Sequence, residues 1–324
     1  MSEVFVSWAP SAKLSGVAIL FFMLGFAAHY FRDWVRPYVL YLIGRTGGCS
    51  LAVSRDYRYL ETRLPEAEKA LKKKSKLLKS ECDGLELWET PRGVYWVPAT
   101  ITSFFFILAE QEIKIYGSGQ FAVQAGDIVL DCGANVGVFT AAALSAGAQL
   151  VVAIEPVPKK VECLQRNFAS EIAAGRVIVY PKGVWHEEAS LEMSLYKDSV
   201  LDSFVMKDRD TDSLGQARFP VTTLDLLAAE LNLPRIDFVK MDVEGANGRA
   251  LQGARRILAS YKPRIAVATE DLDDDYVTIP ALMQKEWPSY QCVRGPCRRQ
   301  GRFQIVPDVL YFTEAPSRRR GTPR

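Results

Sequence analysis

Short apolar runs punctuate the middle and C-terminal parts of the chain at roughly regular intervals. Runs of strand length occur at residues 128–130, 151–154, 177–180, 238–241, 265–268 and 309–312. Between the earlier runs, apolar residues recur at the spacing of an amphipathic helix. Continuous apolar runs that alternate with helices are typical of a parallel sheet covered on both faces. We therefore expect an α/β domain over residues 126–314, with its ligand at the C-terminal ends of the strands.

A longer apolar run lies near the start of the chain. Residues 14–31, LSGVAILFFMLGFAAHYF, contain no Lys, Arg, Asp or Glu. At about 1.5 Å per residue, a helix of this length can cross the hydrocarbon of a bilayer. Arg32, Arg36 and Arg45 follow the run, whereas only Lys13 precedes it closely. This bias predicts a single-pass anchor within residues 1–45, with the rest of the protein facing the cytoplasm. A cleaved signal peptide and a buried core helix are the alternatives.

The segment between the anchor and the main domain, residues 46–125, is expected to form a small extension. Residues 65–81, PEAEKALKKKSKLLKSE, predict a helix that begins near Pro65. Such a lysine-rich helix is either solvated or lies on anionic lipid. Residues 85–106 alternate loosely and predict short strands around a turn. The basic tail, residues 315–324, is expected to be disordered.

Composition adds few constraints to this picture. The chain has 324 residues, 48% of them hydrophobic, and a net charge of +2. This balance allows an anionic partner without requiring one, and we expect no nucleic acid. The six cysteines form no dense framework, which favours free thiols in a reducing compartment over a metal or redox site at Cys292 and Cys297. The basic segment at residues 293–302 could contact an anionic acceptor or form a solvated turn.

The stretch VLDCGANVGVFT, residues 129–140, predicts a strand, a glycine turn and a helix. Gly133 and Gly137 are four residues apart, so the G-x-G-x-x-G fingerprint of dinucleotide sites is missing. Asp131 precedes the turn, and its carboxylate would repel a diphosphate but suits an ammonium group. Asn135 tolerates a positive φ, so the turn can still be tight. Gly137 allows the helix to approach the strand.

A second acid follows the next predicted strand. Glu155 comes 24 residues after Asp131, in the sequence VVAIEPVPKK. An acid at this strand end can accept hydrogen bonds from both hydroxyls of a ribose. Together the two acids favour a nucleoside that has no phosphates and carries an amino acid. S-adenosylmethionine has this structure, and we expect it as the cofactor.

Four motifs in the same order resemble the FkbM-type methyltransferases, a branch of the class I S-adenosylmethionine-dependent enzymes. They are GDIVLDCGANVGVFT, AIEPVPKKVECLQRNF, VTTLDLLAAE and IDFVKMDVEGA, and the resemblance extends over about residues 110–314. It implies a Rossmann-like seven-stranded sheet with helices on both faces and an antiparallel last hairpin. It also implies methylation of a hydroxyl group.

The resemblance assigns cofactor-binding roles to residues at the strand ends. These residues are Asp131, Gly133, Asn135, Gly137, Glu155, Val184, Trp185 and Asp242. Asp131 would bind the amino group of the cofactor directly or through water, and Glu155 would bind the ribose. The methionine portion would lie against the glycine turn. Val184 or Trp185 would cover the adenine, although Trp185 could equally be a core residue.

Four ionisable residues are the catalytic candidates. Lys240, Asp242 and Glu244 alternate at the end of one predicted strand, and Glu270 follows the next. Any of the three acids could remove a hydroxyl proton if its pKa is raised, and Lys240 could act as a base if burial lowers its pKa. In the structural alternative, Glu244 caps the next helix and Lys240 pairs with Asp242. The acids at residues 271–275 are interpreted as solvated, so we assign no metal.

Two other classes of function stay open. A nicotinamide-dependent oxidoreductase is disfavoured by the missing fingerprint and by Asp131. A membrane-tethered module could keep the fold for binding alone. The preferred interpretation is O-methylation of a sugar, glycolipid or other small-molecule or lipid-linked hydroxyl at the cytoplasmic membrane face. The identity of the acceptor and the oligomeric state are left open.

Overall fold

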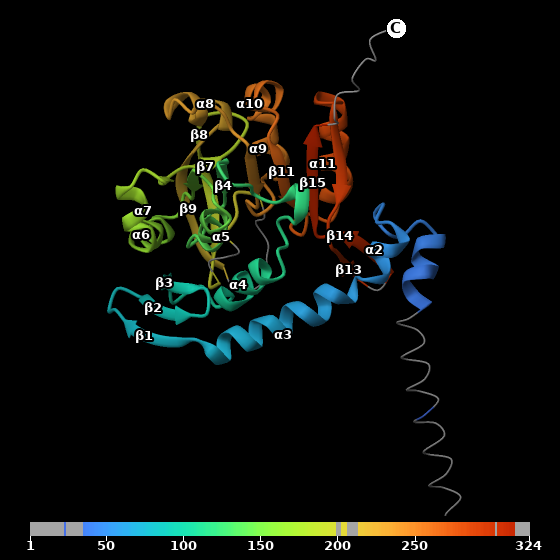
Figure 1. Ribbon diagram of the computed structural model, residues 1–324, viewed down its shortest axis with the longest axis horizontal. Helices are drawn as coiled ribbons and strands as arrows, with labels where there is room; N and C mark the ends of the chain where they lie inside the picture. Colours follow the sequence, from blue (N-terminus) through green and yellow to red (C-terminus); the bar gives the residue numbers. More distant parts are fainter. Residues whose placement is uncertain (1–22, 24–34, 199–201, 206–212, 302, 315–324) are drawn as a thin grey trace, which may run out of the picture.

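A computed structural model of the chain describes residues 23, 35–198, 202–205, 213–301 and 303–314 (Figure 1). The expected anchor, residues 14–31, lies outside this part except for Met23, and so does the expected basic tail. Among the described residues, no helix combines the length and the apolar character needed to cross a membrane.

A seven-stranded sheet forms the centre of the molecule. Its order is β12-β15-β11-β10-β4-β5-β6, and β15 runs antiparallel to both of its neighbours. The strands are β4 (Ile128–Cys132), β5 (Leu150–Ile154), β6 (Val177–Tyr180), β10 (Phe238–Met241), β11 (Arg264–Ala268), β12 (Tyr290–Arg294) and β15 (Val309–Glu314). All six predicted strands are therefore confirmed, as is the antiparallel hairpin at the end. The strand β12 was missed because its residues YQCVR, at the sheet edge, alternate between buried or half-buried and exposed positions.

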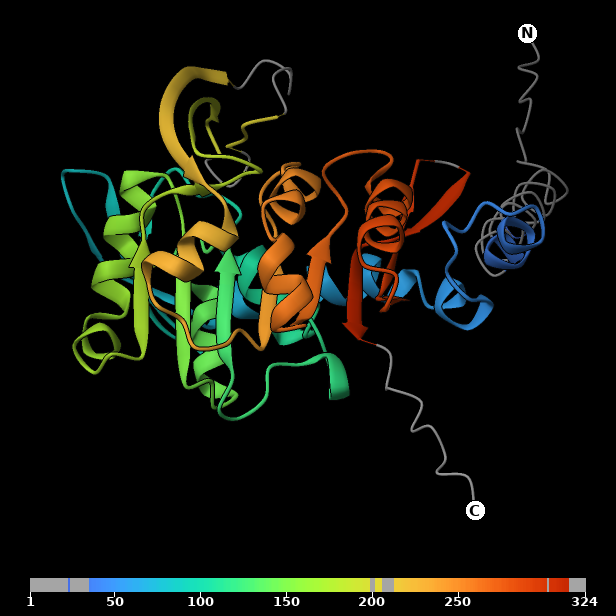
Figure 2. The ribbon, with the colours of Figure 1, turned by 90° about the horizontal axis from the view of Figure 1, so that it is seen from above.

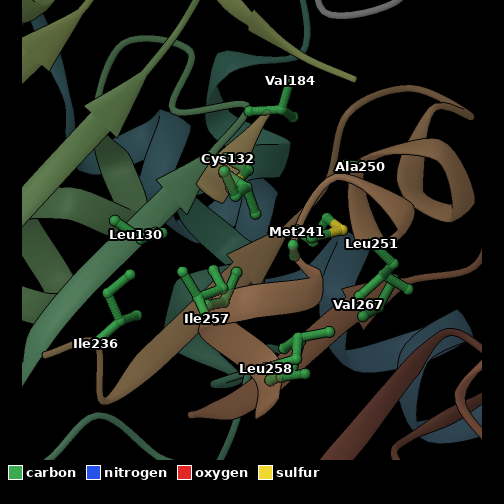
Figure 3. Close-up of a cluster of buried hydrophobic side chains, with 14 of the residues drawn as sticks. Leu130, Cys132, Val184, Ile236, Met241, Ala250, Leu251, Ile257, Leu258 and Val267 are labelled. Carbon is green, nitrogen blue, oxygen red and sulfur yellow. The ribbon is translucent and has the colours of Figure 1, made fainter. Parts of the chain in front are cut away.

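Helices cover both faces of this sheet, as predicted (Figure 2). Successive residues of a strand point to opposite faces, so Leu130 joins one core cluster and Val129 another. The helices that pack in the Leu130 cluster are α8 (Leu224–Glu230), α9 (Asn247–Gln252), α10 (Arg255–Ser260) and α11 (Asp275–Glu286). Figure 3 shows the side chains of this cluster that come from α9 and α10, together with Leu130. The opposite face carries α5 (Val138–Ser145) and α6 (Pro158–Asn167), with the short α7 (Ala169–Ala173) following. Burial of these two apolar layers is the main stabilising term of the domain.

Two small sheets were not predicted from the sequence. One has the order β7-β9-β8, and its strands are β7 (Gly183–Val184), β8 (Ala189–Tyr196) and β9 (Ser213–Thr222). The other pairs β13 (Cys297–Gln300) with β14 (Gln304–Pro307). The pattern missed β8 and β9 because most of their residues are exposed or half-buried, so no apolar run marks them.

The extension preceding the domain consists of helices and one antiparallel sheet. It contains α2 (Leu51–Arg55), α3 (Arg58–Lys74), β1 (Lys76–Ser80), β2 (Leu85–Thr90), β3 (Gly93–Pro98) and α4 (Phe104–Glu112), followed by the short turn η1 (Gly119–Phe121). The predicted helix at residues 65–81 is wrong at both ends. Pro65 lies inside α3 rather than in its first turn, and residues 76–80 pair with β2 as a strand. Leu64 and Leu71 of α3 pack with α4, which explains why the helix forms so far ahead of Pro65.

The cysteine prediction is also wrong in part, because Cys49 and Cys297 form a disulfide. Both sulfur atoms are buried in a small cluster that joins the extension to β13. The basic segment lies at the same junction. Arg294 donates to the carbonyl of Gly47 at 3.1 Å, and Arg299 pairs with Glu61 at 3.0 Å. The positive charges of this segment therefore hold the extension in place instead of forming a solvated turn.

We predict that Cys49→Ser lowers the free energy of unfolding by about 2–5 kcal/mol, because the disulfide restricts the unfolded chain across a long loop. Denaturant unfolding of the oxidised protein measures this loss. Cys82→Ser removes an exposed free thiol and serves as the control. Equal stability of the two variants would contradict the disulfide.

Candidate functional site

The turn between β4 and α5 is built by three residues with positive φ. Gly133 has φ +76°, Asn135 has φ +52° and Gly137 has φ +90°, so the expected left-handed conformation of Asn135 is confirmed. A Cβ added at Gly133 would overlap the carbonyl oxygen of Asp242, and one at Gly137 would overlap the ring of Phe168. Gly133 therefore lets β4 approach the loop after β10. Gly137 lets α5 approach α6.

Glu155 faces the cavity that opens beyond this turn. Its two carboxylate oxygens accept hydrogen bonds from the backbone N–H groups of Asn135 and Val157, each at 3.0 Å. Burial raises the pKa of Glu155, while the charge of Lys160 and these backbone donors lower it. In the described part of the chain, the side-chain oxygen Oδ1 of Asn135 is buried and has no hydrogen-bond partner. The turn thus offers a fixed carboxylate and a free amide oxygen to a ligand.

Asp131 lies below the cavity and does not line it. It is fully buried, its Oδ2 accepts a hydrogen bond from the hydroxyl of Thr140 at 2.7 Å, and its Oδ1 lies 3.4 Å from Nζ of Lys240. Burial raises its pKa, and the charge of Lys240 and the Thr140 bond lower it. Asp131 therefore supports the residues at the bottom of the cavity. From this position its carboxylate does not contact the amino group of a ligand in the cavity directly.

Lys240 is a buried cation that joins the ends of two neighbouring strands. Its Nζ donates to the carbonyl oxygens of Cys132 at 3.3 Å and Gly133 at 2.8 Å. It also lies 3.6 Å from Oδ2 of Asp242 and 5.3 Å from the centre of the Tyr116 ring. Burial works to lower its pKa, but the carboxylates of Asp242 and Asp131 outweigh burial, and the pKa is raised. A base with a lowered pKa is thus contradicted for Lys240, which instead positions the residues around it.

The loop that follows β10 carries the other two predicted acids of this motif. Asp242 accepts a hydrogen bond from the hydroxyl of Tyr116 at 2.8 Å, and its side chain is 23% exposed. Glu244 lines the same cavity and has φ +49°, a costly conformation for a residue with a Cβ. It does not cap the next helix, because α9 begins at Asn247 without a side-chain cap. The structural alternative for Glu244 is therefore wrong.

Glu110 and Glu270 complete an acidic wall on the other side of Asp242. Both line the cavity; Glu110 is buried in α4, whereas Glu270 is exposed to the open cavity. Desolvation, followed by the charges of Asp242 and Asp308, raises the pKa of Glu110 well above its usual value. Desolvation by the surrounding protein, followed by the charges of Asp308 and Glu110, also raises the pKa of Glu270 well above its usual value. Raised values of this kind are common where acids serve a function.

The structure brings most of the predicted site residues together. Around one cavity it places Gly133, Asn135, Glu155, Val184, Lys240, Asp242, Glu244 and Glu270. Three predicted residues do not line it: Asp131 is beneath, Gly137 serves the packing of α5, and Trp185 lies outside. The ring of Trp185 faces Arg249 at 5.8 Å, in a different hollow. Of the two candidates for an adenine wall, the cavity therefore contains Val184.

Four further residues that line the cavity were not predicted from the sequence: Glu110, Tyr116, Lys160 and Asp202. Lys160 and Asp202 are both buried, and their charged atoms are 3.5 Å apart beside Glu155. A signal was present for Glu110, since a single acid inside the apolar run FFFILAEQ is unusual in a buried helix. Tyr116 gave no signal, because its contact with Asp242 spans 126 residues.

The sheet order, the glycine turn after β4 and the acid after β5 are those of a class I methyltransferase. Residues 131–287 match the family described as the methyltransferase FkbM domain. This match, over just under half of the chain, supports an FkbM-type methyltransferase. The match begins after α4, so Glu110 and Tyr116 lie in the preceding extension, outside the matched region.

The individual proteins that the chain resembles have low sequence identity to it. A protein of Beauveria bassiana named Methyltransferase 1 is 26% identical over 213 residues, which cover 60% of this chain and 84% of that protein. A solved FkbM methyltransferase from Methylobacillus flagellatus KT is 18% identical, with a TM-score of 0.43, over 80% of this chain and 61% of that one. Trm5 of Methanocaldococcus jannaschii in complex with adenosine is 16% identical, with a TM-score of 0.42, over 73% of this chain and 57% of that one. The chain thus spans less than two thirds of both solved structures.

We predict that Gly133→Ala destabilises the protein far more than Gly126→Ala does. Both glycines have positive φ, and this conformation costs alanine about 1–2 kcal/mol. Only at Gly133 would the added Cβ also meet backbone, at a further cost of about 1–3 kcal/mol; at Gly126 it meets open space. Denaturant unfolding of both variants provides the comparison, and equal losses would mean that β4 and the loop after β10 do not touch.

Proposed function

We propose that the protein is an S-adenosylmethionine-dependent methyltransferase that methylates a hydroxyl group of an acceptor bound in the cavity beside Asp242. The observation that carries the proposal is that two groups of polar residues line this cavity. We call Glu155 and the free amide oxygen of Asn135 its first side, and the acids Glu110, Asp242 and Glu270, whose charges act on one another, its second side. The first suits a nucleoside that carries an amino acid, and the second suits a group that loses a proton.

The residues on the first side fit the cofactor. Glu155 uses one lone pair on each oxygen for the backbone, so it can accept further bonds from the two ribose hydroxyls. Oδ1 of Asn135 would accept a bond from the amino group, and the bare backbone at Gly133 would allow close approach. Val184 offers an apolar wall for the adenine. When bound, S-adenosylmethionine supplies an electrophilic methyl group on a sulfonium.

The chain's own contribution to the reaction is to position the acceptor and receive its proton. Asp242 is held by the Tyr116 hydroxyl and by the charge of Lys240, so its carboxylate is fixed before an acceptor arrives. Such preorganisation costs nothing at the moment of reaction. We assign the proton-accepting role to Asp242. Glu244 and Glu270 are the other candidates, and Lys240 is a positioning residue.

The acceptor we propose is a sugar, a glycolipid or another small-molecule or lipid-linked alcohol at a membrane, without a nucleic-acid partner. The apolar run at residues 14–31 and the arginines behind it support a membrane anchor with the domain on the cytoplasmic side. The Cys49–Cys297 disulfide does not fit that side, because cytosolic thiols are kept reduced. The thiol state of these two cysteines in cells would decide the side: reduced thiols support the cytoplasm, and an intact bond contradicts it.

We predict that the protein binds S-adenosylmethionine and does not bind NADH. Glu155→Ala is expected to weaken the affinity about 10- to 100-fold, because charged hydrogen bonds contribute about 1.5–3 kcal/mol each. Calorimetric titration measures all three affinities. Glu187→Ala, which changes an acid that is 66% exposed, should bind normally. Tighter binding of NADH would favour the oxidoreductase, and binding of neither ligand would favour a non-catalytic module.

We further predict that Asp242→Asn lowers kcat by about 100-fold or more, since a positioned base contributes roughly 10²–10⁴ to the rate. Although the resemblance also assigns Asp242 to the cofactor, the affinity for S-adenosylmethionine should change little, because Gly133, Asn135 and Glu155 are untouched. Release of S-adenosylhomocysteine in the presence of a cell extract reports the rate. Normal turnover by Asp242→Asn, with loss in Glu244→Gln or Glu270→Gln, would move the base to that residue.

A further inference from the structure

With Asp242 as the proton acceptor, two carboxyl groups of the acidic wall have no part in the proposed reaction. Glu110 is only 6% exposed and lines the cavity, and Glu270 lines it from the end of β11. Within residues 35–198, 202–205, 213–301 and 303–314, neither side chain makes a hydrogen bond or an ion pair. A carboxylate that is nine-tenths buried without a partner is costly, so its retention points to a ligand.

The cations around the wall already have other partners. Lys240 lies against the carboxylates of Asp131 and Asp242 and the two carbonyls of the glycine turn. Arg298 pairs with Asp308 at 2.8 Å. Among the described residues neither cation forms an ion pair with Glu110 or Glu270, although the charge of Lys240 lowers the pKa of Glu110. The two glutamates repel each other. The acceptor half of the cavity therefore carries an excess of negative charge.

This excess can be relieved in two ways. One is protonation, which the raised pKa values of Glu110 and Glu270 would assist; the acids would then donate hydrogen bonds to a neutral acceptor. The other is a positively charged ligand. The methyl donor brings its own ammonium and sulfonium charges, but the proposed function binds its ammonium at Asn135 and its ribose at Glu155. A second cation is needed beside Glu110.

We propose that the methyl acceptor carries an ammonium or guanidinium group close to its reacting hydroxyl, and that Glu110 and Glu270 bind this group. The inference rests on the proposed function in one respect, because it takes the acceptor to enter the cavity beside Asp242. An amino sugar or an amino alcohol has the required chemistry. Two carboxylates on different elements would fix the cationic nitrogen, and the hydroxyl would then point toward Asp242.

Glutamine substitutions separate the two ways of relieving the charge. Glutamine has the shape of a protonated glutamic acid and cannot carry the charge. With a cationic acceptor, we expect Glu110→Gln and Glu270→Gln each to raise KM for the acceptor at least tenfold, with little change in the affinity for S-adenosylmethionine. Glu112→Gln removes a carboxylate from the same helix that is paired with Arg92 outside the cavity, and it should behave like the native protein.

The charge of the acceptor can be determined before the acceptor itself is identified. Small molecules and lipids of a cell extract are divided by a cation exchanger at neutral pH, and each pool is incubated with the full-length protein and methyl-labelled S-adenosylmethionine, with and without EDTA. We expect labelled product from the retained pool in both conditions. Label from the unretained pool alone, label from neither pool, or label abolished by EDTA would overturn the proposal, the last because Mg²⁺ would then be the bound cation.

The pH dependence provides a further check. The titratable groups that face these glutamates are Asp242, Asp308, Asp271 and Tyr116, and Lys240 is the nearby cation. Lowering the pH neutralises the carboxylates, so KM for a cationic acceptor should rise as the pH falls, whereas KM for a neutral acceptor should fall. Failure of S-adenosylmethionine to bind the native protein would refute the proposed function itself. Normal cofactor binding with native-like KM in both glutamine variants would refute only the cationic acceptor.

Discussion

The buried ammonium of Lys240 is the interaction on which the site depends. It binds the carbonyls at the end of β4 and faces the carboxylates of Asp131 and Asp242, so one cation ties together the ends of two adjacent strands. An unpaired charge at this depth would be costly, and each of the three charges is tolerated only because the others are present. Asp131 thus influences the site through Lys240. Because Lys240 binds both the glycine turn and Asp242, the distance between these two is fixed.

The two halves of the cavity have different origins in the chain. The cofactor half comes from β4, β5 and their following turns, which lie inside the region that matches the FkbM family. The acceptor half includes Glu110 and Tyr116, which come from α4 and the turn after it. The packing of α3 on α4 holds this part against the domain, and the disulfide and arginine contacts of β13 hold the other end of α3 (Figure 1). The extension therefore shapes the site as well as covering the sheet.

The sequence predicted those features that depend on local patterns. Buried parallel strands appear as apolar runs, so their positions were correct, and Glu155 and the Lys240 motif were found because they directly follow such runs. Features that depend on distant contacts were missed. Cys49 and Cys297 are 248 residues apart, and no spacing rule connects them. The strand β1 looked helical because its lysines favour a helix, whereas its pairing with β2 decides the outcome.

The central claim is that one cavity holds the methyl donor against Glu155 and the acceptor against Asp242. A crystal structure of the protein with S-adenosylhomocysteine tests it most directly. The account predicts that both ribose hydroxyls lie within hydrogen-bond distance of Glu155, that the amino group lies near Asn135, and that the sulfur faces Asp242 across the space lined by Glu110 and Glu270. A ligand bound elsewhere, or one whose sulfur points away from Asp242, would contradict it.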